Sequence, residues 1–214
     1  MPAFDAAIFD LDGLLIDTER LAIDAGQDTL KTMGWPQPDG LFHRLTGKDE
    51  ATGLAILAAH FGPTFPALEF GGNWNRRFAD MLDDGIPLRP GATALLDQLS
   101  QIGLPRAVAT SSQRSSAERK LRITGLDRYF STVVSVNCIT KPKPAPDPYL
   151  EAARRLGADP TRCVAFEDSD TGAEAAHRAG MRVVQVPDML STTGPYAHHL
   201  ADDLLTGARM AGLI

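Results

Sequence analysis

Two aspartates follow a short apolar segment near the start of the chain, at a spacing that suits nucleophilic attack and proton transfer. Asp10 directly follows the run Ala6-Ala7-Ile8-Phe9, and Asp12 and Gly13 come next. An apolar run of this kind is typical of a strand that is buried on both faces, so both acids are expected at the edge of a sheet. A carboxylate there is unfavourable unless a cation or a hydrogen-bond donor meets it. The rest of the chain is therefore expected to supply such a partner.

Polar side chains also follow the later apolar runs. These are Thr110-Ser111-Ser112 after residues 105–109, Lys141 and Lys143 after residues 132–136, and Glu167-Asp168 after residues 163–166. In an open parallel sheet the ligand site lies outside the carboxyl ends of the strands. Carboxylates from two strands suit Mg²⁺, which prefers oxygen ligands, and hydroxyls beside the first amides of a helix suit phosphate oxygens. The combination predicts a magnesium ion next to a phosphate group.

The same residues indicate a mechanism. Asp10 is placed to attack phosphorus and form an aspartyl-phosphate, and Asp12 to protonate the leaving oxygen and later accept a proton from water. Mg²⁺ and Lys143 would stabilise the charge that develops. Each motif alone has a simpler interpretation, such as a turn, a helix cap or a solvated lysine, but a calcium loop is excluded because Leu14 occupies its third acidic position. Four motifs after four successive predicted strands favour a joint site.

The alternation of elements indicates how these residues are positioned. Strands are predicted at residues 4–9, 105–109, 132–136, 163–166 and 182–186, and helices at 92–102, 115–123, 148–156 and 171–179. This order predicts an α/β protein with a Rossmann-like, doubly wound parallel sheet. Residues 17–86 contain no strand pattern but three helix patterns, at 18–33, 50–61 and 65–82. We therefore expect a core domain of residues 1–16 and 87–214 and an inserted, all-helical cap domain of residues 17–86.

Composition limits the possible partners. The chain has 214 residues, of which 43% are hydrophobic and 22% charged, so a well-packed core is possible. Its net charge of -6 disfavours nucleic acid and anionic membranes as partners. Cys138 and Cys163 have no metal-ligand spacing and are expected to be free thiols in a reducing compartment. Without a leader pattern or a long apolar span, a soluble protein of the cytoplasm is expected. A monomer is the default expectation.

The four motifs, taken in order, resemble those of the haloacid dehalogenase (HAD) superfamily of phosphohydrolases, in the subgroup with a helical cap after the first motif. The segments Phe9 to Leu21 and Ala179 to Val184 are similar to pseudouridine-5'-phosphatases and to bacterial sugar-phosphate phosphatases. The resemblance implies that Asp10 is the nucleophile, Asp12 the general acid/base, Thr110 the phosphate-binding hydroxyl and Lys143 the charge-balancing lysine. It also implies that Mg²⁺ is bound by Asp10, Asp168 and the backbone carbonyl of Asp12, with Glu167 close by or coordinating.

The function expected from this resemblance is a Mg²⁺-dependent phosphatase acting on a small phosphomonoester, either a sugar phosphate or a nucleotide-like compound. One alternative is a phosphomutase of the beta-phosphoglucomutase kind, whose cap carries a histidine and an arginine where this chain has Ala22 and Glu50. A second alternative is a protein that binds a phosphorylated metabolite without catalysis. Pro142 stands where the family usually has glycine, so the sequence leaves open whether Lys141 shares the role of Lys143.

Substrate choice is expected to depend on the cap, because closure of a lid excludes water and contacts the leaving group. Glu19, Gly47 and Lys48 are the candidate cap residues. Ser111 and Ser112 are expected to bind the phosphate together with Thr110 and Lys143. The partner predicted from the whole chain is thus a small phosphorylated metabolite.

Overall fold

The computed structural model describes residues 4–48 and 50–214 and divides the chain into two units. The core unit comprises Met1–Asp17 and Pro87–Ile214, and the helical unit comprises Thr18–Ile86. Residues 1–3 of the predicted core segment and residue 49 of the predicted cap segment lie outside the described residues. Each unit is described by itself below.

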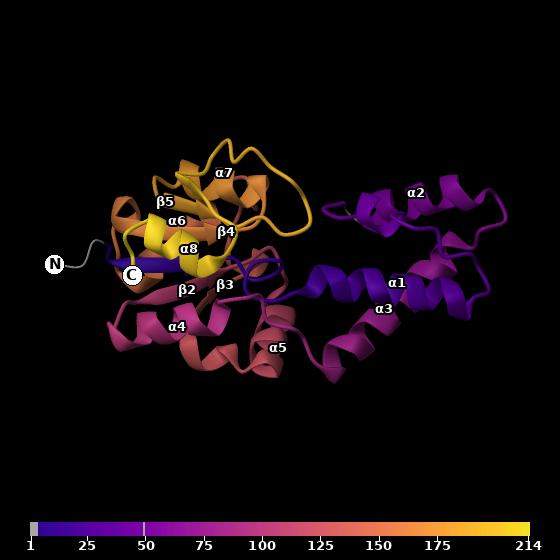
Figure 1. Cartoon of the computed structure of the whole chain (residues 1–214), viewed down its shortest axis with the longest axis horizontal. Coiled ribbons are helices and arrows are strands. Elements are labelled where there is room, and N and C mark those ends of the chain that lie inside the picture. The colour runs from indigo at the N-terminus through magenta and orange to yellow at the C-terminus, as the bar shows by residue number, and fades with distance from the viewer. Residues whose placement is uncertain (1–3, 49) are drawn as a thin grey trace. The chain divides into compact units, whose positions relative to one another are not determined.

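The core unit is built on a six-stranded parallel sheet with the order β3-β2-β1-β4-β5-β6 (Figure 1). The strands are β1 (Ala6–Phe9), β2 (Arg106–Ala109), β3 (Thr132–Val134), β4 (Cys163–Glu167), β5 (Arg182–Gln185) and β6 (His199–Leu200). This topology confirms the predicted α/β class and the doubly wound parallel sheet. The first five strands lie within two residues of the predicted ends. The sixth was not predicted, because two residues that include a histidine make no apolar run.

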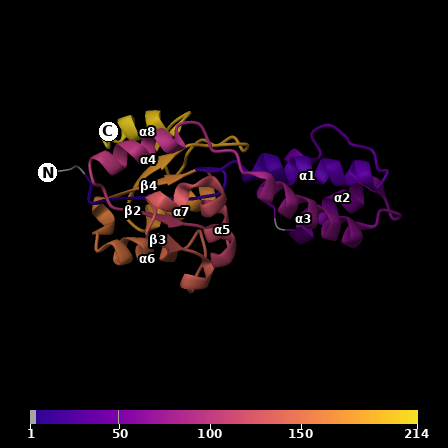
Figure 2. The same cartoon turned by 90° about the horizontal axis from the view of Figure 1, so that it is seen from below.

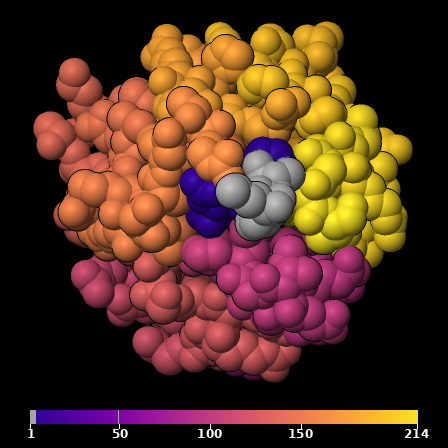
Figure 3. Space-filling view, turned by 90° about the vertical axis from the view of Figure 1, so that its left-hand side faces the viewer, coloured from indigo at the N-terminus to yellow at the C-terminus, as the bar shows by residue number. Residues whose placement is uncertain are grey.

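Helices cover both faces of this sheet. On one face α6 (Asp147–Leu156) and α7 (Asp170–Arg178) pack against small strand residues such as Ala107 and Ala165, which let the helices approach closely. Figure 2 shows α4 (Ala92–Gln101) and α8 (Leu204–Met210) on the opposite side of the sheet from α6. Figure 3 shows the C-terminal segment lying directly beside α4. The short α8 was not predicted, and it completes the cover of this face.

The ends of the core helices follow local chemistry. Gly125 and Gly157 come directly after α5 (Arg114–Thr124) and α6, and each adopts a left-handed φ of 66° that glycine adopts without strain. The side chain of Ser169 caps α7 by accepting a hydrogen bond from the Gly172 amide at 3.2 Å. The Ser169 cap begins α7 just beyond the carboxyl end of β4, and α5 begins a few residues after β2 ends.

The helical unit contains α1 (Thr18–Thr32), a single turn at Phe42–Arg44, α2 (Glu50–Phe61) and α3 (Ala67–Asp84) (Figure 2). Its core is a cluster of large apolar side chains: Leu30, Leu41, Phe42, Leu45, Leu57, Phe65 and Phe70. The glycine pair in α3 does not interrupt the helix. A Cβ on Gly71 would lie only 3.0 Å from Leu54, so glycine at this position lets α2 approach. No helix within the described residues is long and apolar enough to cross a membrane.

Replacement of Gly26 by alanine is expected to destabilise the helical unit. A Cβ at this position in α1 would lie 2.2 Å from the buried ring of Phe42, so the ring or the helix must shift. Overpacking of this kind costs about 1–3 kcal/mol of unfolding free energy. Gly72→Ala is the matched control, because its Cβ meets nothing within 4 Å in the exposed middle of α3, and it should stabilise by about 0.5–1 kcal/mol. Urea unfolding of both variants tests the difference, and equal stability would contradict it.

Candidate active site

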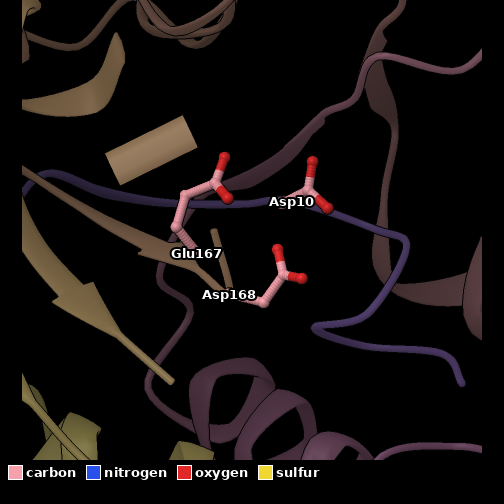
Figure 4. A group of neighbouring side chains, drawn as sticks. All are labelled: Asp10, Glu167 and Asp168. Atoms are coloured by element: carbon pink, nitrogen blue, oxygen red, sulfur yellow. The ribbon is translucent and has the colours of Figure 1, made fainter. Parts of the chain in front are cut away.

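Three carboxylates gather at the carboxyl ends of the two central strands. Phe9 of β1 is in register with Phe166 of β4, so the next residues, Asp10 and Glu167, lie side by side. The rings of Phe9 and Phe166 stack at 4.8 Å between centroids and support the pairing of β1 with β4. Oxygen atoms of Asp10, Glu167 and Asp168 all lie within 4.8 Å of one another (Figure 4). The strand register therefore brings Asp10 next to Glu167 and Asp168, two consecutive residues that are distant from it in sequence.

Lys143 enters this group from the loop between β3 and α6. Its Nζ donates to Asp10 Oδ1 and to Glu167 Oε1, each at 2.5 Å, and its side chain is only 5% exposed. Lys141 is exposed, and its backbone amide donates to Asp147 at 3.1 Å. The structure thus brings Lys143, and not Lys141, to the carboxylates.

The electrostatic balance of the group favours an additional cation. Burial raises the pKa of Asp10, with Glu167 and Asp12 acting in the same direction, and this pKa reaches about 7 although the charge of Lys143 opposes the rise. Burial alone would lower the pKa of Lys143, but the charges of Asp10 and Glu167 outweigh it and raise the pKa. One ammonium faces three carboxylates, which leaves surplus negative charge. The donor set is made only of oxygens and fits a hard divalent cation.

Tyr149 and two glycines hold the acids in place. The Tyr149 hydroxyl, fully buried on α6, donates to Glu167 Oε1, and burial raises the tyrosine pKa well above its usual value. A Cβ on Gly172 would lie 2.0 Å from the Glu167 carboxylate, and one on Gly13 would lie 2.3 Å from Asp168 Oδ2. These close approaches require glycine. Tyr149 was not predicted as a site residue, because it occupies an ordinary core-facing position of its helix.

The predicted phosphate-binding segment follows β2. Thr110 is buried with 2% exposure, and its hydroxyl accepts a hydrogen bond from the Ser112 amide at 3.0 Å. Ser111 is exposed, and Ser112 is half-buried. The segment leads into α5, whose first amides provide donors of the type that bind phosphate oxygens.

The Asp12 side chain bonds to different residues from those of the acidic group. Its Oδ2 accepts from the Ser112 hydroxyl at 2.8 Å, and its Oδ1 accepts from Lys120 Nζ at 2.7 Å. Among the described residues, the three-carboxylate group does not include the Asp12 side chain. Lys120 was missed by the sequence reasoning. Its only signal is a position on the buried stripe of α5, between Ala117 and Leu121, where a charged residue is unusual.

The candidate cap residues are brought together within the helical unit. Glu19, Gly47 and Lys48 line one cavity of about 300 Å³. The aromatic side chains of Phe42, Trp74 and Phe78 contribute to its wall, and Trp74 is fixed by donating from Nε1 to the Ala22 carbonyl at 2.7 Å. The cavity therefore combines an apolar wall with two acids, Glu19 and Glu50, and one base, Lys48.

Comparison with known proteins gives consistent matches. The sequence profile of haloacid dehalogenase-like hydrolases matches residues 7–186. The chain is 33% identical over 177 residues to a phosphorylated carbohydrates phosphatase from Thermotoga maritima, and the match covers 83% of this chain and 82% of that protein.

Two further similarities extend over nearly the whole chain. It is 32% identical over 201 residues to a bifunctional riboflavin kinase/FMN phosphatase from Arabidopsis thaliana, which covers 92% of this chain but 52% of that protein, so the chain spans about half of this relative's length. A crystal structure described as a putative beta-phosphoglucomutase from Thermotoga maritima superposes with a TM-score of 0.86 at 28% identity. That superposition covers 98% of this chain and 100% of the other.

Proposed function

This chain belongs to the haloacid dehalogenase-like hydrolases, and we propose that it is a Mg²⁺-dependent phosphatase that hydrolyses a small-molecule phosphomonoester through an aspartyl-phosphate on Asp10. A single observation carries the proposal, which is the convergence of Asp10, Glu167 and Asp168 around Lys143 at the ends of β1 and β4. The relatives support phosphoric monoester hydrolysis as the type of reaction.

Asp10 and Asp12 divide the covalent chemistry between them. An Asp10 oxygen attacks phosphorus, the bond from phosphorus to the leaving oxygen breaks, and the Asp12 carboxylic acid gives its proton to that oxygen. Water then attacks the aspartyl-phosphate, Asp12 takes the proton of this water, and phosphate and free Asp10 are regenerated. Lys143 stays charged throughout and offsets the negative charge beside Asp10.

The phosphate group is bound between the carboxylates and the start of α5. Thr110 and Ser111 offer hydroxyls to the phosphate oxygens, and Lys143 offers its ammonium. Ser112 lies beside them, with its amide donating to Thr110 and its hydroxyl to Asp12. Asp10, Asp168 and the backbone carbonyl of Asp12 would hold Mg²⁺, with Glu167 beside them. The bound ion supplies charge neutralisation that lets an anionic nucleophile approach an anionic phosphate.

Removal of divalent metal is expected to abolish turnover reversibly. Purified protein is assayed with p-nitrophenyl phosphate, then with excess EDTA, and then after addition of Mg²⁺, with inorganic phosphate release as the readout. We expect a loss of about 10³-fold or more with EDTA and recovery with Mg²⁺, because charge neutralisation is the main catalytic term in phosphoryl transfer. Activity that persists in EDTA would contradict the proposed metal dependence.

The substrate is proposed to be a small phosphorylated metabolite, either a sugar phosphate or a nucleotide-like compound, as the substrates named for the two relatives are. We propose that Glu19, Gly47 and Lys48 select it through the cavity that they line. A panel of sugar phosphates, nucleotides, FMN and pseudouridine 5'-phosphate, assayed in parallel, tests the substrate class. Failure of the wild-type protein to hydrolyse any of them would count strongly against the function.

Lys48→Ala is expected to raise KM for the preferred metabolite by about tenfold, which corresponds to loss of one charge-assisted contact of about 1.4 kcal/mol. Hydrolysis of p-nitrophenyl phosphate should change much less, because its small leaving group reaches fewer cap residues. Lys31→Ala is the matched control, since Lys31 is an exposed lysine of the same unit that does not line the cavity. Equal effects of the two substitutions on KM would remove Lys48 from the site.

A phosphomutase is the second candidate, favoured by the close superposition on a structure described as a putative beta-phosphoglucomutase. Against it, Ala22 offers only its carbonyl, to Trp74, and Glu50 is an acid that accepts a hydrogen bond from Asn75 at 3.0 Å. Neither replaces the histidine or the arginine expected of a mutase cap. Conversion of beta-glucose 1-phosphate to glucose 6-phosphate with a bisphosphate activator would establish the mutase. Tight phosphate binding without turnover would instead establish a non-catalytic binding protein.

A further inference from the structure

A second buried lysine lies beside the second aspartate of the first motif. Lys120 projects from α5 with 8% exposure, and its Nζ lies 2.7 Å from Asp12 Oδ1 and 3.1 Å from the Ser112 hydroxyl oxygen. Burial of an ammonium is unfavourable unless it is paired and hydrogen-bonded. The ion pair with Asp12, which is 108 positions away in the sequence, offsets the unfavourable free energy of burying the Lys120 ammonium. A charged residue on the inner stripe of a helix is therefore explained by this one carboxylate.

The contacts of Asp12 define the orientation of its carboxylate. Lys120 donates to Oδ1 and the Ser112 hydroxyl donates to Oδ2 at 2.8 Å, so each oxygen has its own donor. Two donors on different oxygens restrict both the rotation of the side chain and the plane of the carboxylate. A carboxylate has about four acceptor positions, so hydrogen bonds from two donors are compatible with its geometry. The two contacts thus hold the Asp12 carboxylate in one orientation.

The two buried lysines of the core unit serve different acids. Lys143 bonds Asp10 and Glu167, and Lys120 bonds Asp12. Lys120 comes from α5, the helix that begins directly after the segment Thr110-Ser111-Ser112. The helix that follows the predicted phosphate-binding segment therefore also contacts the predicted proton-transfer group.

We propose that Lys120 is a positioning residue for Asp12, and that it holds this carboxylate where a proton can pass to the leaving oxygen of the substrate. The inference rests on the proposed phosphatase function. In the step concerned, the bond from phosphorus to the leaving oxygen breaks as the Asp12 proton moves to that oxygen. Lys120 exchanges no proton with the substrate and acts only through its contacts with Asp12 and Ser112.

Substrates whose leaving groups differ in basicity distinguish a positioning role of Lys120 from a purely structural role. An alkyl phosphate expels a strongly basic alkoxide that needs a proton, whereas p-nitrophenyl phosphate expels a weakly basic phenolate that needs little help. General acid catalysis contributes about 10²–10⁴-fold where it is needed. Misplacement of Asp12 must therefore slow alkyl substrates selectively, whereas a general loss of structure slows both classes equally.

The experiment measures kcat/KM for p-nitrophenyl phosphate and for an alkyl phosphate that the wild type hydrolyses, because kcat/KM reports the steps up to departure of the leaving group. Lys120→Met is compared with Lys120→Arg and with Arg122→Met, a cation-to-methionine change at an exposed position of the same helix. We expect Lys120→Met to lower kcat/KM by about 100-fold for the alkyl phosphate and by less than about tenfold for the aryl phosphate. Lys120→Arg should restore most of the alkyl activity, and Arg122→Met should match the wild type.

A double-mutant cycle completes the test. In an Asp12→Asn background, Lys120→Met should cause almost no further loss, since a residue that acts through Asp12 has nothing left to position. Equal losses on both substrate classes, or a full additional loss in the Asp12→Asn background, would overturn the inference while leaving the phosphatase intact. Melting temperatures identify variants that fail to fold. If Lys120→Met does not fold, Lys120→Arg, which retains the charge, is used instead to compare kcat/KM for the two substrate classes. A wild type that hydrolyses neither substrate would overturn the phosphatase function, and with it the step that Lys120 serves.

Discussion

Asp10→Asn is expected to reduce turnover by at least 10³-fold while the fold remains intact. The substitution replaces the attacking carboxylate by an amide of nearly the same shape that is a very poor nucleophile. The carboxylate is buried and its pKa is raised to about 7, so the protein gains little stability from the charge at this position. Lys143 keeps Glu167 as its partner at 2.5 Å. We therefore expect the free energy of unfolding to change by no more than about 1 kcal/mol.

The measurement combines phosphate release with urea unfolding on the same preparations. Asp202→Asn is the matched control, because it makes the same chemical change at an exposed aspartate of the core unit and should leave both quantities unaltered. Incubation with a phosphorylated substrate, followed by acid quench and mass spectrometry, should detect a phosphoryl adduct on wild-type Asp10 and none in the variant. A variant that keeps more than a tenth of wild-type turnover would remove Asp10 from the role of nucleophile.

Lys143→Ala is expected to affect both activity and stability. Without the ammonium, the buried carboxylates of Asp10 and Glu167 face each other with no cation between them in metal-free protein. Loss of one partner from a buried ion pair costs about 3–5 kcal/mol, so the free energy of unfolding in EDTA should fall by about this amount. Turnover should fall by about 10²–10³-fold, because the charge opposite the phosphate is lost.

Lys141→Ala provides a sharp comparison, since the two lysines lie two positions apart in one loop, and Lys141 is exposed whereas the Lys143 side chain is only 5% exposed. The Lys141 variant should retain wild-type activity and stability, because an exposed side chain contributes little. Added Mg²⁺ should recover part of the stability lost in the Lys143 variant, as a cation again faces the carboxylates. Similar losses in both variants would show that the loop as a whole, and not the ammonium of Lys143, is required.

Most of the fold could be predicted because its signals are local. Apolar runs such as residues 163–166 and glycines after helices, such as Gly157, mark elements without reference to the rest of the chain. The strand and the α-helix that were missed, β6 and α8, are short and lie after the last apolar run. Their existence depends on the open edge and face of the sheet, which no local pattern describes.

The acids of the site were predictable because each one ends a strand, and parallel strands bring their carboxyl ends to one edge. The supporting residues were not. Tyr149 reaches Glu167 and Lys120 reaches Asp12 through helix packing, across 18 and 108 positions. The choice between Lys141 and Lys143 likewise depends on the path of one loop over the sheet, which the spacing of the two lysines does not define.

The pairing of β1 with β4 has a consequence for how the protein is made. The two strands that carry Asp10 and Glu167 are separated by more than half of the chain, and they pair directly in the centre of the sheet. On the ribosome, which releases the N-terminus first, β1 must wait for Cys163–Glu167 to emerge before this pair can form. Thr18–Ile86, in contrast, is continuous in sequence and can close its own contacts early. The nascent chain therefore completes the helical unit well before its acidic centre exists, so the centre can form only late in synthesis.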